Sequence, residues 1–372
     1  MNTTTQGRII GIRHRVKHTA DNEARPTQLW FGYGSDQGLV ELKAEQDELE
    51  FVRNGLESGD KVAMVLGGSG DSLAYALSRA GEEKGVRVFR IPAFLLKEMR
   101  GESDKDDDAR LLADMLAAFP ERFYEVRARD RALIEVVESF RARMDAMRAR
   151  IACEQRLRAS FIGKTFRSPD GFYPEGVLED LFDVEKASDK ILAALVAEEK
   201  GRNSDLTKAL ERLDVYTQIF ADVEGCGMSV SAGIIAAVQD IRRFESPAKL
   251  KAFLGAHLVM DEDGEGFVFA RRRRGRISNW NPDGRQALYL FADQMNRRPK
   301  SVWGLKLREY KVKFRRKHPE VVVVGGKKRY TDGHIHKMAT WRTITKFVEW
   351  LYREWWALEG GVPAMSKVKK VA

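Results

Sequence analysis

The sequence predicts an α/β domain over residues 1–127, a helical spacer over 128–215 and a mainly α-helical domain over 216–358. Three observations predict this organisation. Short apolar segments rich in β-branched residues fill the first part, and amphipathic helical periodicity dominates the second. The third part combines helical segments with a surplus of Lys and Arg. We expect residues 359–372 to form a disordered basic tail.

The first part alternates strand-like and helix-like segments. The apolar, β-branched segments "GRIIGIRHRV", "TQLWFGYG" and "DKVAMVLGG" predict strands. A helix predicted for "DSLAYALSRAGEEKG" is followed by another strand-like segment, "VRVFRIP". A strand, a helix and a strand in this order predict a parallel pair joined by a crossover helix, and hence an α/β core.

Helical periodicity marks the spacer. Residues 129–163 place apolar side chains at helical spacing with charges between them, and helix resumes after the break "SPDGFYPEG". Two long amphipathic helices joined by a loop predict either an antiparallel hairpin or a coiled coil that makes the chain a homo-oligomer. A plain helical bundle without a partner is an equally good interpretation.

The charge of the chain is unevenly distributed. Residues 241–372 hold 30 Lys and Arg against 13 Asp and Glu, a net charge of +17, whereas residues 1–240 hold 34 against 42, a net charge of −8. Six of the seven tryptophans also lie in the basic part. A basic segment of this size favours binding of a polyanion, nucleic acid above all, over a solvated charged surface.

Neither a membrane location nor a cysteine-based site is predicted. The sequence has no signal peptide and no apolar run long enough to cross a bilayer, so we expect a cytoplasmic protein without membrane contacts. Cys153 and Cys226 lie far apart without metal-ligand spacing, which indicates reduced packing residues.

A glycine-rich turn opens a helix in "VEGCGMSVSAGIIAAV". Gly225 and Gly227 would let the backbone approach a partner closely, and N–H groups at the helix start, around Ser229, could hold a phosphate. This is how a helix-hairpin-helix-like element holds a DNA backbone. The alternative is ordinary capping, because many helices begin with Gly and Ser.

The run "RRRRGRISNWNPDGRQALYL" is the densest cationic stretch of the chain. Arginines beside Asn and Trp are typical of surfaces that bind phosphates and stack bases. The preceding acidic "DEDGEG" could instead pair with the arginines in a hairpin. We predict nucleic-acid contacts from Arg271, Arg272, Arg273, Arg274, Arg276, Ser278, Asn279 and Arg285.

Two other motifs have ordinary structural explanations. Gly67, Gly68 and Gly70 in "VLGGSGDSLAYAL" lack the pattern of a nucleotide-binding loop and predict a tight strand-to-helix turn. His334 and His336 in "YTDGHIHKM" would point to the same side of a strand-like segment, but no third metal ligand follows, so capping or phosphate contact is the favoured interpretation.

Taken together, these stretches resemble the transposases of the insertion sequence 110 family, which are related to the Piv-type DNA invertases. The segment "VEGCGMSVSAGIIAAVQDIRRFESPAKLKAFLGAH" resembles their C-terminal motif, and "GRISNWNPDGRQALYLFADQM" resembles their "GxISKxGNxxLRxxL" segment. Near the N-terminus, "DDARLLADM" resembles the "DAxxLA" that closes the family's nuclease domain. The resemblance covers nearly the whole chain.

The resemblance implies a RuvC-like (ribonuclease-H-like) domain, a coiled-coil spacer and a transposase domain that act as an oligomer on DNA with a structured guide RNA. It also implies four acidic residues that hold Mg²⁺ and a serine that attacks DNA. In this chain Arg13 replaces the first acidic residue and Gly67 the second. Asp108 matches the last, but its partner position holds Lys105, which leaves Asp104 as the substitute.

The serine position also departs from the family pattern. It aligns with Asp263-Gly264, and the nearest serine flanked by basic residues is Ser278, which corresponds to a different motif. The resemblance therefore leaves the nucleophile without a clear counterpart in this chain.

The acidic stretch "GESDKDDDARLLADM" has two interpretations. Asp104 and Asp108, four residues apart on one helix face, are the candidate catalytic and Mg²⁺-binding residues. A two-metal nuclease, however, needs carboxylates that converge from separate strands. In the alternative, which we favour, the stretch only begins a helix, with Asp106 or Asp107 as its N-cap.

These features support three hypotheses about function. The first is a DNA transposase or recombinase that cuts and exchanges strands with Mg²⁺, DNA and a guide RNA. The second is a catalytically inactive descendant that retains nucleic-acid binding. A weaker third is a protein scaffold in which the long helices bind a partner.

Overall fold

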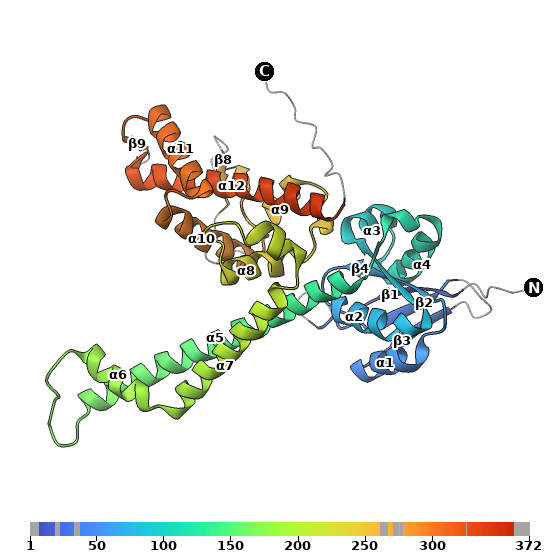
Figure 1. The fold of residues 1–372 in the computed structure, drawn as a ribbon, viewed down its shortest axis with the longest axis horizontal. Helices are drawn as coiled ribbons and strands as arrows, with labels where there is room; N and C mark the ends of the chain where they lie inside the picture. Colours follow the sequence, from blue (N-terminus) through green and yellow to red (C-terminus); the bar gives the residue numbers. More distant parts are fainter. Residues whose placement is uncertain are drawn as a thin grey trace, which may run out of the picture.

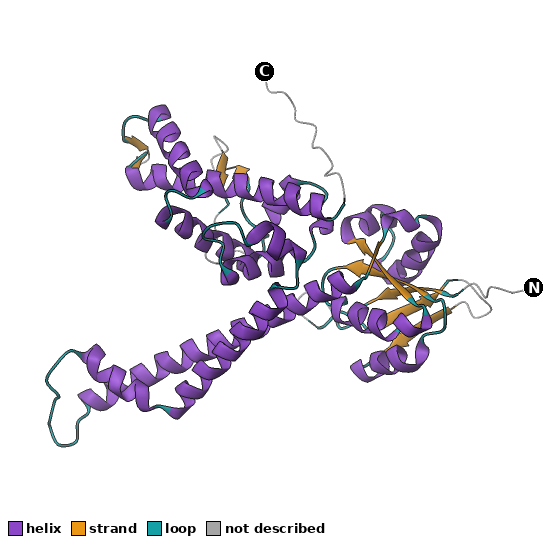
Figure 2. Cartoon of the chain, viewed as in Figure 1, coloured by secondary structure: helices purple, strands orange, loops and turns teal. Residues whose placement is uncertain are grey.

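The computed structural model describes residues 7–18, 23–32, 38–260, 267–270, 275, 278–324 and 326–360. Within these residues the chain forms an N-terminal α/β part, a long helical hairpin and a C-terminal helical part (Figure 1). Strands are concentrated in the N-terminal part, and helices make up most of the remainder (Figure 2). Across the described ranges, no helix is both long and apolar enough to span a lipid bilayer.

The N-terminal part is built on a six-stranded mixed sheet of order β3-β2-β1-β4-β5-β6. The strands are β1 (Ile9–Arg13), β2 (Thr27–Phe31), β3 (Gly38–Leu42), β4 (Lys61–Leu66), β5 (Arg87–Pro92) and β6 (Tyr124–Glu125). Antiparallel pairing joins β1 to β2, β2 to β3 and β5 to β6, whereas β4 pairs in parallel with β1 and β5. Helix α2 (Asp71–Ala80) connects β4 to β5, which confirms the predicted parallel pair with a crossover helix.

Both faces of the sheet are covered. Alternate residues of a strand point to opposite faces, so Val62 and Met64 of β4 pack with α2, whereas Ala63 packs on the other side. That other side is covered by α3 (Ala93–Arg100) and α4 (Asp108–Ala118). Two elements of the N-terminal part are additions to the prediction: β3, an edge strand with mostly exposed residues, and the helix α1 (Glu45–Glu50).

Helix α4 lies unusually close to β1. A Cβ atom added at Gly11 would lie 1.9 Å from the carbonyl oxygen of Ala109, so only glycine permits this approach. The close packing places the start of α4, including Asp108, beside Arg13 at the end of β1. The predicted acidic stretch therefore lies beside the carboxyl end of the first strand.

The spacer is an intramolecular antiparallel hairpin. Helix α5 (Ala128–Phe166) runs away from the sheet, α6 (Leu178–Ser188) turns the chain, and α7 (Lys190–Leu210) returns along α5 (Figure 1). Asp189 lies between α6 and α7 and is the N-cap of α7, where its side chain accepts a hydrogen bond from Leu192 N at 2.7 Å. Of the predicted alternatives, the structure contains the hairpin.

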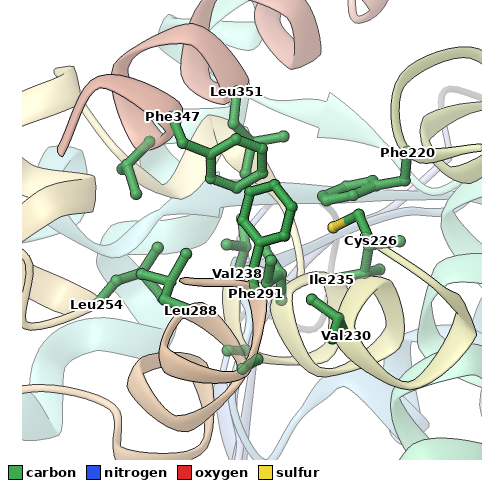
Figure 3. Close-up of a cluster of buried hydrophobic side chains, with 14 of the residues drawn as sticks. Phe220, Cys226, Val230, Ile235, Val238, Leu254, Leu288, Phe291, Phe347 and Leu351 are labelled. Carbon is green, nitrogen blue, oxygen red and sulfur yellow. The ribbon is translucent and has the colours of Figure 1, made fainter. Parts of the chain in front are cut away.

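The C-terminal part packs five helices, α8 (Met228–Val238), α9 (Pro247–Phe253), α10 (Pro282–Arg297), α11 (Val302–Lys317) and α12 (Asp332–Leu358). Two short hairpins accompany them, β7 (Leu258–Met260) with β8 (Phe267–Phe269), and β9 (Val322–Val324) with β10 (Lys327–Arg329). Figure 3 shows its core, where Phe220, Phe291 and Phe347 meet between the helices. Val136 of α5 and Leu210 of α7 belong to the same core, so the base of the spacer is packed into this part.

A buried ion network joins the N-terminal and C-terminal parts. Arg242 donates to Asp240 (Nε to Oδ1, 2.9 Å) and also pairs with Asp130 of α5. Arg90 of β5 lies 3.5 Å from Asp130 and donates to Asp71 at 2.9 Å. Burial alone would lower the pKa of Arg242, but its hydrogen bond and attraction to Asp240, with further attraction to Asp130, raise it above the usual value. The network therefore keeps Arg242 charged inside the protein.

Candidate nucleic-acid interface and the acidic stretch

Asp104 caps a short 3₁₀ turn and does not lie on α4. Its Oδ1 accepts a hydrogen bond from Asp106 N at 3.1 Å, at the start of the turn Lys105–Asp107. The prediction that Asp104 and Asp108 share one helix face is therefore wrong, because the 3₁₀ turn separates Asp104 from the helix. The predicted cap is also wrong: Asp107 precedes α4 without a side-chain capping bond, and Asp104 does the capping one turn earlier.

Asp106 is held by two arginines. Its Oδ1 accepts from Arg13 Nη1 at 2.8 Å and also pairs with Arg25. Arg13 is the last residue of β1, so this contact fastens the acidic stretch to the first strand. The guanidinium of Arg13 thus lies where the resemblance places the first metal-binding carboxylate.

Asp108 is almost fully buried at the start of α4, with 7% of its surface exposed. Arg100 Nε lies 2.8 Å from its Oδ1, in an ion pair that is not aligned as a hydrogen bond. Burial raises the pKa of Asp108, and the positive charges of Arg100 and Arg13 oppose that rise. The carboxylate is thus paired with an arginine.

The loop from β4 to α2 leaves no room for the second acidic residue. Gly67 has a φ of 83°, and a Cβ atom there would lie 2.7 Å from Arg243 Nε of the C-terminal part. The loop is a strand-to-helix turn, as predicted, in which Gly67 N donates to Asp71 Oδ1 at 3.2 Å. A glutamate at this position would have to displace Arg243.

These residues do not fit Mg²⁺. The ion prefers near-octahedral coordination by oxygen, usually with carboxylates among its ligands, and the family positions here hold Arg13, Gly67 and Lys105. Arg13 and Arg100 already neutralise Asp106 and Asp108. Within the described ranges, no group of three or more His, Cys, Asp or Glu side chains could hold a metal ion.

The predicted glycine-rich turn opens α8. Gly227 is exposed and precedes the helix without a side-chain cap, and Ser229 is exposed in the first turn. Gly225 has a different role from the one expected: its φ is 89°, and a Cβ atom there would lie 2.9 Å from the Cβ of Gln294 in α10. Its close approach is to the neighbouring helix, whereas Gly227 and Ser229 face solvent.

The arginine run follows the β7–β8 hairpin directly. Arg271, Arg272, Arg273, Arg274 and Arg276 lie outside the described residues, as does Asp263-Gly264. Asn279 is exposed and Ser278 is half-buried just before α10, whose N-cap is Asn281. An exposed helix start and a dense cationic run therefore belong to one continuous segment of the chain.

Residues 217–305 match the Transposase IS116/IS110/IS902 family. This transposase segment contains the start of α8, the arginine run and α10. A search of curated proteins found no match to the chain. The family match supports the resemblance for this segment, and the N-terminal sheet and the spacer lie outside it.

Arg285 of the transposase segment, one of the predicted nucleic-acid contacts, makes internal contacts. Its guanidinium donates to Gly255 O at 2.8 Å and to Ala270 O at 2.6 Å. It also lies 4.6 Å from the ring centroids of both Trp280 and Trp341. Arg285 therefore closes the β7–β8 hairpin and fixes the point from which the arginine run departs. No sequence signal links it to Trp341, because the two residues are distant in the chain.

The two histidines of "YTDGHIHKM" lie in a helix, so the expected strand-like segment is a wrong prediction. Both belong to the first turns of α12, whose N-cap Thr331 accepts a hydrogen bond from His334 N at 3.3 Å. His334 Nδ1 accepts from Tyr330 N at 3.0 Å. His334 is thus part of a local capping arrangement, which is the interpretation favoured above.

Proposed function

We propose that this chain binds DNA, together with a structured RNA, through its C-terminal part, and that its N-terminal sheet does not cut DNA. One observation carries the proposal: Arg13 ends β1 at the position of the first metal ligand and pairs with Asp106. A guanidinium in that position repels a divalent cation and occupies the carboxylate that would otherwise be available to it.

Nucleic-acid binding is supported by the transposase segment and by charge. The segment carries the arginine run and the exposed start of α8, whose N–H groups and helix dipole favour an anion. Residues 241–372 have a net charge of +17, which attracts phosphates independently of sequence. Metal-dependent strand cutting has no comparable support among the described side chains.

The proposal predicts binding without Mg²⁺-dependent cleavage. The purified protein is incubated with DNA, with RNA transcribed from the sequence that flanks its gene, and with Mg²⁺, and products are resolved on a denaturing gel. We expect intact DNA, and we expect Asp104→Ala and Asp108→Ala to leave the product pattern unchanged. Asp114→Ala, an exposed acidic residue on α4, is the matched control. Nicking that requires Mg²⁺ and disappears in the Asp104 or Asp108 variant, but not in the control, would refute the loss of cutting.

We further propose that two copies associate through the tip of the spacer. Large apolar side chains gather there with 68% to 73% of their surface exposed: Phe166, Phe172, Val184 and Ile191. The tip projects away from both other parts (Figure 1), so it is free to meet a second copy. Exposed apolar patches on otherwise charged surfaces mark interaction sites.

Sedimentation equilibrium tests this association. We expect a concentration-dependent dimer for the wild type and a monomer for Phe166→Ser with Val184→Ser. The matched control is Val302→Ser with Val312→Ser, since these two exposed side chains lie on α11. A wild-type monomer at every concentration, or equal dimerisation by the tip variant, would exclude the tip as the interface.

A further inference from the structure

Residues 311–337 form a second cationic region, which we call the distal basic end. It comprises the last turns of α11, the β9–β10 hairpin and the first turns of α12. Figure 1 shows α11 and β9 at the end of the C-terminal part farthest from the N-terminal sheet. Nine Lys and Arg residues stand here against two acidic ones, and the region lies outside the transposase segment.

Most of this charge is not neutralised by any residue that the structure describes. Arg316, Lys317, Lys328 and Arg329 are exposed, and none of them forms an ion pair with any residue that the structure describes. Arg315 is the exception, since its Nη2 donates to Asp332 Oδ1 at 2.7 Å. Unpaired cations packed this closely repel one another, and a bound polyanion would relieve that repulsion.

Three rings stack beside these cations. The ring of Tyr330 lies 3.9 Å from that of His318 with an angle of 7° between their planes. It also lies 5.5 Å from the ring of His334, with an angle of 6° between their planes. All three side chains are half-buried. The stack is a set of parallel flat surfaces at the edge of a cationic region.

The surrounding residues hold this stack in place. Arg315 Nη1 donates to the carbonyl oxygens of Tyr330 at 3.0 Å and His318 at 3.2 Å, which fixes the two backbones beside each other. Tyr330 has a φ of 61°, a left-handed conformation that is strained for a bulky residue. Strain of this kind persists only where the surroundings impose it, and it often marks a binding or switching site.

A groove adjoins the stack between α11 and the start of α12. Its volume is about 870 Å³, and its walls include Lys311, Arg315, Arg316 and His336. The Nδ1 atom of His336 is buried without a hydrogen-bond partner within the described residues. The groove therefore combines cationic side chains with the carboxylate of Asp332 and with apolar side chains, next to a set of stacked rings.

We propose that the distal basic end binds an unpaired stretch of nucleic acid. Phosphates contact Arg316, Lys317 and Lys328, and a base stacks on the His318–Tyr330–His334 rings. Bases expose their flat faces only when unpaired, and stacking of such bases on aromatic side chains is tolerant of sequence. The proposal rests on the nucleic-acid binding proposed above and adds a second site to it, selective for single strands.

The stack is tested with Tyr330→Gly, because glycine tolerates the positive φ while removing the ring. Affinities are measured by fluorescence anisotropy for labelled single-stranded RNA, single-stranded DNA and duplex DNA of one sequence. We expect about tenfold weaker binding of both single strands and unchanged binding of the duplex. Tyr330→Phe, which keeps the ring, should bind like the wild type, and thermal melting by circular dichroism checks that each variant is folded.

The cations are tested with Arg316→Glu and Lys317→Glu together. For the single strands, the slope of log affinity against log salt should fall in magnitude by about 1.4, or 0.7 for each phosphate contact. Lys190→Glu with Lys200→Glu, two exposed residues of α7, is the matched control and should change neither slope nor affinity.

The outcomes separate this proposal from the one it rests on. If the wild type binds nucleic acid but Tyr330→Gly binds single strands equally well, or loses duplex binding to the same extent, the stacking site is refuted and the general function stands. If Arg316→Glu with Lys317→Glu keeps the wild-type slope, the phosphate contacts are refuted. If the wild type binds no oligonucleotide at low salt, both proposals fail together.

Discussion

Reversing the charge of Arg271, Arg272, Arg273 and Arg274 to Glu is expected to abolish measurable duplex binding near physiological salt. Each lost phosphate contact lowers the magnitude of the salt slope by about 0.9, so four contacts lower it by about 3.6. In the sequence the run follows Ala270, whose carbonyl oxygen accepts a hydrogen bond from Arg285. Titrations of a labelled duplex between about 50 and 200 mM salt measure both quantities.

A control with the same change in net charge separates local contact from general attraction. Lys43, Lys190, Lys200 and Lys208 are exposed and belong to the N-terminal part and to α7. Their reversal to Glu should lower affinity far less than reversal of the arginine run. Equal losses in the two variants would mean that the total charge of the chain, and not this run, determines binding.

Asp130→Ala is expected to destabilise the chain by about 3–5 kcal/mol, the usual cost of breaking a buried ion pair. Asp130 is 2% exposed and lies between Arg90 of the sheet and Arg242 of the C-terminal part. Its removal leaves two buried guanidinium groups with one fewer carboxylate. Urea unfolding followed by circular dichroism measures the change in the free energy of unfolding.

The matched control is Asp205→Ala, since Asp205 is an exposed acidic residue of another long helix, α7. We expect a change within about 0.5 kcal/mol there. If Asp130→Ala is as mild as the control, the network does not hold the N-terminal and C-terminal parts together, and the two should then unfold in separate transitions.

Local pattern was sufficient to predict much of the secondary structure. The β-branched segments became β1, β2, β4 and β5, and the helix between the last two became the crossover α2. The edge strand β3 was missed because its residues are mostly exposed and therefore show no buried face in the sequence. The split of the second spacer helix into α6 and α7 depends on the Asp189 cap, which is one residue among many acidic ones.

Contacts between distant residues could not be predicted in the same way. Arg13 stood out as a departure from the family pattern, but its partner Asp106 lies 93 positions away. Arg242 and Asp130 are separated by 112 positions, so no local pattern in the sequence pairs them. Periodicity reports which face of an element is buried, whereas the partner of a buried charge depends on how the elements assemble.

The contacts of Arg285 and the stacking of the three rings could not be predicted for the same reason, because both depend on how the helices assemble. Arg285 belongs to a basic stretch, which indicated nucleic acid, yet folding places it between Trp280 and Trp341. His318, Tyr330 and His334 become a stack only because Arg315 and the β9–β10 hairpin bring α11 and α12 together at one end.

The affinity of the unmodified protein for a labelled duplex, titrated from low to physiological salt, tests the central claim most directly. We predict tight binding at low salt that weakens steeply as salt rises, because Lys and Arg that neutralise phosphates release the counterions condensed on the DNA. An absence of binding at low salt, or an affinity that salt leaves unchanged, would contradict the assignment of the C-terminal part as a nucleic-acid interface.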